Sequence, residues 1–170
     1  MAKFEPAFDR LMQHEGGYVF DPHDKGGETF CGISRAFWPH WVGWVRIDNY
    51  KREGKEVIVD GILKSWVKEF YRENYWRKIG LIADQRIAYA VLDTVVQFGA
   101  RGAQAIQGIL GVDKDGIIGM QTVTAINNCN QELFLKELIE WRKQKRRDVI
   151  TANPSQARFA KGWEVRDNSL

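Results

Sequence analysis

The chain has 170 residues and a mass of 19.7 kDa, the size of one domain with at most a small appendage. Its hydrophobic content of 44% and charged content of 28% lie near globular averages and argue against disorder. The net charge of +3 suits an anionic polymer as partner but is too small to indicate nucleic acid. No apolar run reaches the ~20 residues of a membrane helix, and residues 1–15 do not resemble a signal peptide.

The first third of the chain predicts a helix, a hairpin and less regular segments. Apolar residues recur at helical spacing over 4–14, and Gly16-Gly17 ends this helix at Glu15. Residues 16–32 hold five glycines and predict a turn-rich loop or a small β-hairpin that turns at 25–27. We expect a short helix at 34–42. A second hairpin is expected at 44–60, where β-branched residues alternate with polar ones.

The remainder predicts helices. Apolar faces indicate them over about 62–76, 87–98, 103–110, 122–127 and 131–151, with Gly111 and Asn153-Pro154 as stops. We therefore expect a mainly α (α+β) fold with a small hairpin. A shift in composition near residues 99–102 places a boundary between 1–98 and 99–170, with both parts in the same globule.

Residues 14–33 carry the clearest chemistry in the chain. Glu15 follows a helix that buries Leu11 and Met12, and partial burial beside a helix C-terminus favours the protonated form of a carboxyl group. Asp24 comes nine residues later and Thr29 five residues after that. A general acid, a second carboxylate and a hydroxyl are the groups that surround a glycosidic bond and an attacking water.

Two other interpretations of this segment stay open. One is that the segment has no catalytic role, because glutamate before two glycines is common and a segment rich in Asp, Gly and Thr is usually an ordinary loop. A calcium site is the other, since Asp21, Asp24 and Glu28 supply oxygen ligands, although their spacing departs from the EF-hand order. The histidines have no zinc-ligand spacing with the cysteines, so we predict no metal and no cofactor. Cys31 and Cys129 are expected to be free thiols.

Residues 15–34 contain, in this order, the motifs Glu-Gly-Gly-Tyr, Asp-Pro-x-Asp-x-Gly-Gly-x-Thr and Gly-Ile-Ser. This arrangement resembles the opening of the glycoside hydrolase family 108 muramidases. These are phage- and prophage-type N-acetylmuramidases, sometimes described as secretion activators. Residues 71–76, 110–122 and 159–166 resemble later signatures of the family, so the resemblance spans nearly the whole chain. It implies a lysozyme-like helical part, with the hairpin at the active-site cleft, and a peptidoglycan-binding-like part after residue 98.

The resemblance also implies an activity. It is hydrolysis of the β-1,4 bond between N-acetylmuramic acid and N-acetylglucosamine in peptidoglycan glycan strands, with Glu15 as the general acid. Asp24 and Thr29 match positions that hold or activate water. Substrate contacts are expected from Tyr18, Asp21, Trp76 and Gln97. The protein would be a monomer made in the cytoplasm that acts in the periplasm or cell wall after holin-dependent release or dedicated export.

Some positions depart from the family pattern. Phe20 and Gln97 each stand where an asparagine is typical, which leaves substrate preference open. Cys31 replaces a usual tyrosine, Met120-Gln121 replaces a Pro-Lys pair, and residues 43–60 resemble an insertion. None of these removes Glu15.

Two further features allow several interpretations. Five basic residues lie within 142–147; we favour a solvated helix face, then binding to an anionic wall polymer, and last nucleic acid. Of Trp38, Trp41 and Trp44, at least one is expected at the cleft edge.

The helices of the C-terminal part either bind the wall or pack the fold, and we favour packing. The rival function is a non-catalytic peptidoglycan-binding or secretion-accessory protein.

Overall fold

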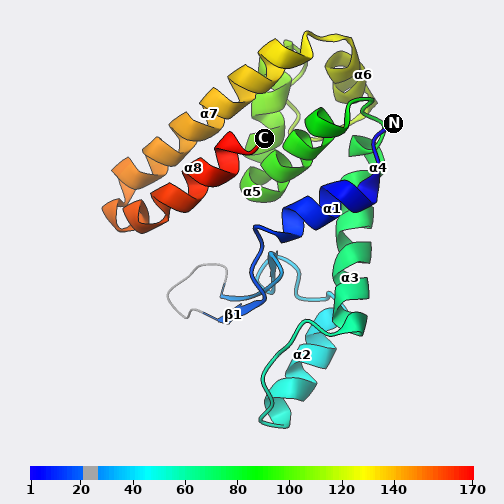
Figure 1. Cartoon of the computed structure of the whole chain (residues 1–170), viewed down its shortest axis with the longest axis vertical. Coiled ribbons are helices and arrows are strands. Elements are labelled where there is room, and N and C mark those ends of the chain that lie inside the picture. Colours follow the sequence, from blue (N-terminus) through cyan, green and yellow to red (C-terminus); the bar gives the residue numbers. More distant parts are fainter. Residues whose placement is uncertain (21–26) are drawn as a thin grey trace. The chain divides into compact units, whose positions relative to one another are not determined.

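The computed structural model describes residues 1–20 and 27–170, and it divides into two compact units (Figure 1). One unit contains residues 8–74, and the other contains residues 1–7 together with 75–170. The fold is mainly α with a small antiparallel sheet, as the sequence predicts. In the described part of the chain, no helix combines the length and the apolar character needed to cross a membrane. The predicted boundary at 98/99 stays a prediction.

The small sheet lies in the unit of residues 8–74. Helix α1 (Phe4–Met12) precedes strands β1 (Tyr18–Phe20), β2 (Glu28–Phe30) and β3 (Ile33–Ser34), which are ordered β1-β2-β3. Both pairs are antiparallel, with Tyr18 opposite Phe30 and Thr29 opposite Ser34. The predicted hairpin is thus confirmed by β1 and β2, while most of its expected turn lies outside the described residues. α1 ends two residues before the predicted 4–14, because the chain tightens into a turn in which His14 N donates to Leu11 O.

Two predictions in the same unit were wrong. Helix α2 (Gly43–Arg52) occupies most of the segment predicted as a second hairpin. Trp44 and Ile47 are buried three residues apart, so the apparent alternation is the face of a helix. The helix predicted at 34–42 is absent from that described segment, where Pro39 disfavours helical geometry for the residue before it.

Helix α3 (Gly61–Tyr71) confirms the helix predicted from residue 62. Asp60 caps it by accepting from the backbone N–H groups of Ile62 and Leu63. The helix continues as a π-helical turn, η1 (Arg72–Trp76), a distortion that is common near functional sites. The core of this unit combines one face of α3 with the sheet and α2, through the buried residues Phe8, Leu11, Phe30, Ile33, Trp44, Ile47, Leu63, Val67 and Tyr71.

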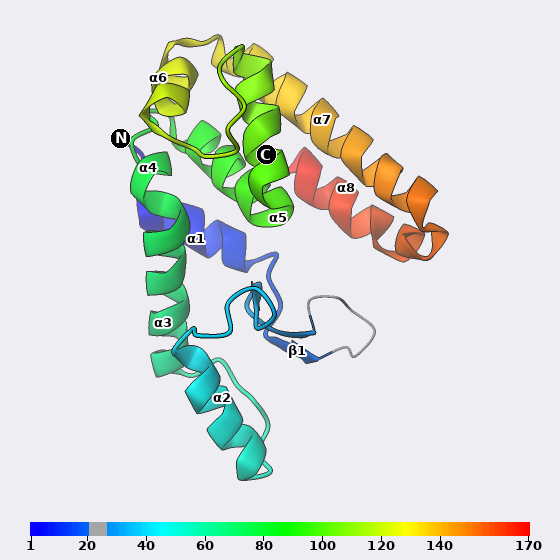
Figure 2. The same cartoon turned by 180° about the vertical axis from the view of Figure 1, so that it is seen from behind.

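The other unit is helical throughout its regular elements. These are α4 (Arg77–Ile79), α5 (Gln85–Leu110), α6 (Met120–Asn128), α7 (Gln131–Ala152), the 3₁₀ helix η2 (Pro154–Phe159) and α8 (Ala160–Asn168). The two helices predicted at 87–98 and 103–110 are the halves of α5, which bends at Gly99, where φ is 57° and ψ is −139°. α7 packs against both α5 and α8, and the α7–α8 pair is visible from both sides (Figures 1 and 2).

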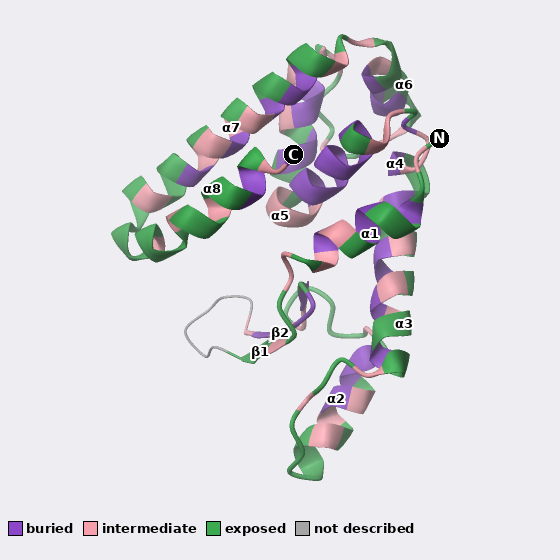
Figure 3. Cartoon of the chain, viewed as in Figure 1, coloured by how far each residue is buried: buried purple, intermediate pink, exposed green. Residues whose placement is uncertain are grey.

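A buried ionic network joins α5, which carries a long stretch of buried residues, to α7 and α8, where buried positions are fewer (Figure 3). Asp93 Oδ2 pairs with Arg142 Nη2 at 2.6 Å, and Asp93 Oδ1 pairs with Arg166 Nη2 at 2.6 Å. Asp167 accepts from Arg142 Nε at 2.8 Å and from Arg146 Nε at 2.7 Å. Three guanidinium groups therefore share two carboxylates away from water.

This network corrects the favoured interpretation of the basic run at 142–147. Arg142 and Arg146 are buried, so these two do not belong to a solvated face. Lys143, Lys145 and Arg147 keep partly or fully exposed positions. Burial alone raises the pKa of Asp93, but the nearby charges of Arg142 and Arg166 outweigh it and hold that pKa below its ordinary value.

Candidate active site

The Glu15 carboxylate lies against the backbone of Gly32 in the unit of residues 8–74. Glu15 follows α1 in a bend, Gly32 belongs to the turn between β2 and β3, and Tyr71 is the last residue of α3. A Cβ built on Gly32 would lie 2.5 Å from Tyr71 Oη and 2.7 Å from Glu15 Oε2. The glycine therefore leaves the space that the carboxylate and the phenol occupy together.

The turn that carries Gly32 is held in an uncommon conformation. Cys31 and Gly32 have φ angles of 47° and 80°, both in the left-handed region. Tyr71 donates its hydroxyl hydrogen to the Cys31 carbonyl at 2.9 Å and is itself buried, with Phe8 and Phe70 against its ring. Because its ring is fixed by packing, Tyr71 anchors the turn next to Glu15.

The Cys31 thiol lies close to Glu15 and is free and buried. Burial, together with the negative charge of Glu15, raises the pKa of this thiol to about 11. The thiol is therefore protonated at neutral pH and adds no second negative charge beside the carboxylate. The prediction that Cys31 and Cys129 are free thiols is confirmed.

Thr29 and Tyr18 lie on the small sheet. Thr29 is half-buried in the middle of β2, opposite Val19 and Ser34. Tyr18 donates its hydroxyl hydrogen to Glu28 Oε1 at 2.8 Å, and burial followed by this contact raises the Tyr18 pKa. The structure thus places Tyr18, Thr29 and Glu15 in one unit, whereas Asp21 and Asp24 lie outside the described residues. The catalytic and binding roles of these residues stay predictions.

Glu28, considered above as an oxygen ligand for calcium, forms ion pairs that the sequence did not indicate. Its side chain is buried, and its oxygens form ion pairs with Arg35 and Lys51, both at 3.0 Å. Arg35 also bonds Asp48 on α2 at 2.8 Å, so Glu28 links the sheet to α2. In residues 1–20 and 27–170, no cluster of three His, Cys, Asp or Glu side chains is arranged to hold a metal ion.

Trp76 and Gln97, both predicted to bind substrate, belong to the other unit. Trp76 is buried and packs on Phe4, with ring centroids 5.6 Å apart, and a Cβ on Gly80 would lie 2.6 Å from its Nε1. Gln97 accepts a hydrogen bond from Arg146 Nη2 at 3.3 Å. These contacts show what each side chain does inside its unit, and the substrate roles stay predictions.

An aromatic pocket of about 380 Å³ opens on the unit that holds Glu15. Trp38 stands edge-on to Phe70 at 4.8 Å between ring centroids and is 38% exposed. Trp44 is buried and donates its indole N–H to the Trp38 carbonyl at 2.7 Å. Of the three clustered tryptophans, Trp38 and Trp41 line this pocket and Trp44 packs in the core. The full lining is Phe37, Trp38, Pro39, His40, Trp41, Val42, Phe70 and Asn74.

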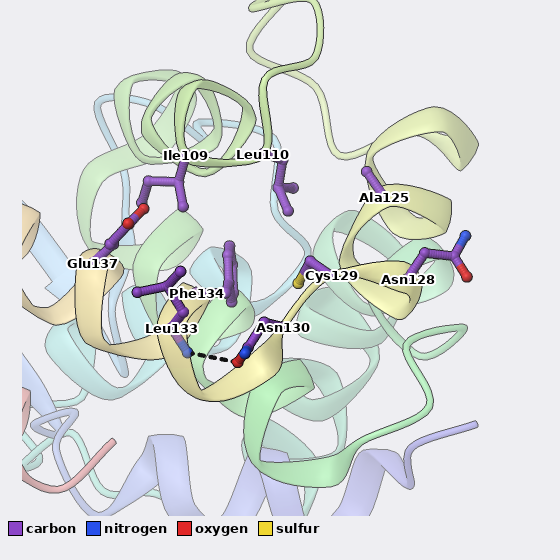
Figure 4. Close-up of a pocket in the computed structure, with 9 residues that line it drawn as sticks. All are labelled: Ile109, Leu110, Ala125, Asn128, Cys129, Asn130, Leu133, Phe134 and Glu137. Carbon is purple, nitrogen blue, oxygen red and sulfur yellow. Dashed lines mark hydrogen bonds between the residues drawn. The ribbon is translucent and has the colours of Figure 1, made fainter.

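Another pocket lies in the unit of residues 75–170, between the end of α5, α6 and the start of α7 (Figure 4). Cys129 and Phe134 form part of its wall, and Glu137 supplies its ionisable group. Asn130 at its edge caps α7 by accepting from Leu133 N at 3.1 Å.

The fold is mainly α and lysozyme-like, and the class of protein that its family match indicates is a glycoside hydrolase. The chain belongs to the glycosyl hydrolase 108 family, which matches residues 8–99. A second family, described as a predicted peptidoglycan domain, matches residues 101–168.

The structure titled "Structure of Brucella abortus SagA" is similar to this chain, with 30% sequence identity and a TM-score of 0.68. The similarity covers 98% of this chain and 90% of that one. Comparison with curated protein sequences gives no significant match. The family resemblance inferred from the sequence is thus confirmed.

Proposed function

We propose that the protein is an N-acetylmuramidase that cleaves the β-1,4 bond between N-acetylmuramic acid and N-acetylglucosamine, with Glu15 as the general acid. The observation that carries this proposal is the position of the Glu15 carboxylate, set against Gly32 and beside Tyr71. Catalytic carboxyl groups act from a fixed position, and a turn anchored by Tyr71 supplies one. Membership of a glycoside hydrolase family supports the reaction class.

In the proposed reaction, Glu15 gives its proton to the glycosidic oxygen as the bond to the anomeric carbon breaks. A water held by Asp24 or Thr29 attacks that carbon and loses its proton to the Asp24 carboxylate. A single acid with a water-holding partner favours inversion of configuration, which needs carboxyl groups about 6.5–9.5 Å apart rather than 5–5.5 Å. Tyr71 and Gly32 would act as positioning residues for Glu15.

The aromatic pocket supports a sugar polymer as substrate. The faces of sugar rings stack on indole, and Trp38 offers an exposed indole on the same unit as Glu15. Trp38→Ala would then raise KM for glycan strands more than it lowers kcat. A Val45→Ala variant, at an exposed apolar position on α2 outside this pocket, is the matched control.

A second candidate function is that of a non-catalytic wall-binding or secretion-accessory protein. The match of residues 101–168 to a predicted peptidoglycan domain favours this alternative. Such a protein would pellet with sacculi and release no reducing ends. In either case the proposed site of action is the periplasm or cell wall, reached by holin-dependent release or dedicated export, and cell fractionation with and without a holin would distinguish these routes.

The bond that is cleaved can be identified by mass spectrometry of fragments released from purified Gram-negative sacculi. Reducing ends on N-acetylmuramic acid support the proposal. Reducing ends on N-acetylglucosamine would make the protein a glucosaminidase. Intact sacculi that pellet with the protein would support the binding function instead.

A further inference from the structure

A groove between α7 and α8 lies far along the chain from Glu15 and has the chemistry of an anion site. It encloses about 210 Å³ in the unit of residues 1–7 and 75–170. Its lining residues are Lys143, Arg146, Arg147, Ile150, Ala160, Trp163, Glu164 and Asp167. The lining thus combines three cations with two carboxylates and three apolar side chains.

The buried ionic network reaches the surface at this groove. Arg146 and Asp167 are the members of the network that line the groove, and Arg146 is 8% exposed. Its Nε and Nη2 bond Asp167, whereas its Nη1 makes no hydrogen bond to any residue in the described part of the chain.

Two aromatic rings pack near the Arg146 guanidinium, which the ion pair with Asp167 also holds in place. The guanidinium lies 5.1 Å from the ring centroid of Trp163 and 5.1 Å from that of Phe98. Lys143 and Arg147 lie one turn of α7 apart at the groove, and Arg147 is oriented by two hydrogen bonds to Gln144 Oε1. An anion that enters this groove would meet a nearly buried guanidinium and two more accessible cations.

The signs and sizes of the lining groups select one class of anion. Glu164 adds a carboxylate at the groove and disfavours a uniformly anionic polymer such as nucleic acid, but it suits a ligand that also carries an amino group. Ile150, Ala160 and Trp163 offer small apolar contacts. A short peptide with free carboxylates, an amino group and methyl side chains satisfies all of these, and the stem peptides of peptidoglycan have this composition.

We propose that the α7–α8 groove binds the carboxylates of peptidoglycan stem peptides through Arg146, Lys143 and Arg147. The proposal rests on the proposed function, because it takes the same polymer as substrate. It assigns wall binding to a region where the sequence analysis favoured packing alone. The pocket in Figure 4 is a poorer match, because its ionisable group is Glu137, which repels a carboxylate.

The test compares binding to two preparations of sacculi, one intact and one stripped of stem peptides by an amidase. The Glu15→Gln protein is used so that the sacculi stay intact. Lys143→Ala combined with Arg147→Ala should weaken binding to intact sacculi about fivefold, since partly exposed charge pairs contribute modestly. The matched control combines Lys136→Ala with Lys161→Ala, which removes two exposed charges from the same helices outside the groove.

The proposal predicts that stripping the peptides weakens binding of the parent protein and removes the difference between the groove variant and the control. Equal binding of both variants to intact sacculi would overturn it. So would undiminished binding of the parent protein to stripped glycan. Failure of the proposed function is seen separately, as absence of reducing ends from wild-type protein whatever the groove binds.

Discussion

The backbone of Gly32 takes up the space beside the Glu15 carboxylate, and a Cβ at position 32 would lie 2.7 Å from Glu15 Oε2. Real Cβ atoms do not approach other heavy atoms so closely, so any side chain here would displace the carboxylate, the Tyr71 hydroxyl or the turn. The geometry of the acid and the identity of this glycine are therefore linked.

Gly32→Ala should lower activity strongly while lowering the free energy of unfolding only modestly. Alanine at φ +80° is strained by about 1–2 kcal/mol, and its Cβ would also displace Glu15. A misplacement near 1 Å lowers turnover on the order of 100-fold. Gly54→Ala is the control, since Gly54 has φ +65° with open space around its Cβ position. Equal activities of the two variants would show that Gly32 does not position the acid.

Tyr71→Phe should lower the free energy of unfolding by about 1 kcal/mol. The change removes the hydroxyl that donates to the Cys31 carbonyl and leaves that buried acceptor without its partner. Denaturant titration measures the loss, and activity should fall with it because the turn beside Glu15 loosens. Unchanged stability together with unchanged activity would contradict the anchoring role.

The sequence predicted the elements that depend on local pattern and missed the contacts between them. Helical spacing located α3, both halves of α5 and α7, and the glycine-rich segment located β1 and β2. The hairpin predicted at 44–60 failed, because Val45 and Ile47 alternate with polar residues as in a strand, whereas the structure buries Ile47 together with Trp44 on one helix face and leaves Val45 exposed.

The same limit applies to the site. The sequence motif indicated Glu15 and the glycines around it. It could not indicate the contact of Tyr71 with the Cys31 carbonyl, because these two residues lie 40 positions apart in the sequence. The basic run at 142–147 was interpreted as solvated because its partners Asp93 and Asp167 lie far along the sequence. The Arg166 signature was seen, and the structure shows its contact with Asp93.

Asp93→Asn should destabilise the protein by about 3–5 kcal/mol, because it leaves Arg142 and Arg166 short of a buried counter-charge. Glu132→Gln, which breaks the exposed pair with Arg86, should cost no more than about 1 kcal/mol. Chemical denaturation of both variants checks the ranking. Equal costs would mean that the network contributes no more than a surface pair.

The ionic network around Asp93 should also make the free energy of unfolding depend on pH in the acidic range. The folded pKa of Asp93 lies below its unfolded value of about 3.9, so its contribution is present above that value and is lost as pH falls through the lower folded pKa. The unfolding free energy of the wild type should therefore fall on acidification below about pH 4, and less steeply in Asp93→Asn. Identical slopes would refute this assignment.

Cys31 should react with iodoacetamide more slowly than Cys129 at pH 8. Its pKa of about 11 leaves little thiolate, and it is buried, whereas Cys129 is only partly covered. Single-thiol variants, Cys129→Ser and Cys31→Ser, allow each rate to be measured by mass spectrometry. Faster labelling at Cys31 would contradict the closed environment beside Glu15.

The role of Glu15 as the general acid can be tested by measuring reducing-end release from purified Gram-negative sacculi. The wild type is compared with Glu15→Gln and with Glu56→Gln, a control at an exposed glutamate of the same unit. If Glu15 is the acid, the wild type and Glu56→Gln release reducing ends, and a folded Glu15→Gln protein loses nearly all of this release. Release by Glu15→Gln at the wild-type rate would show that Glu15 is not the acid.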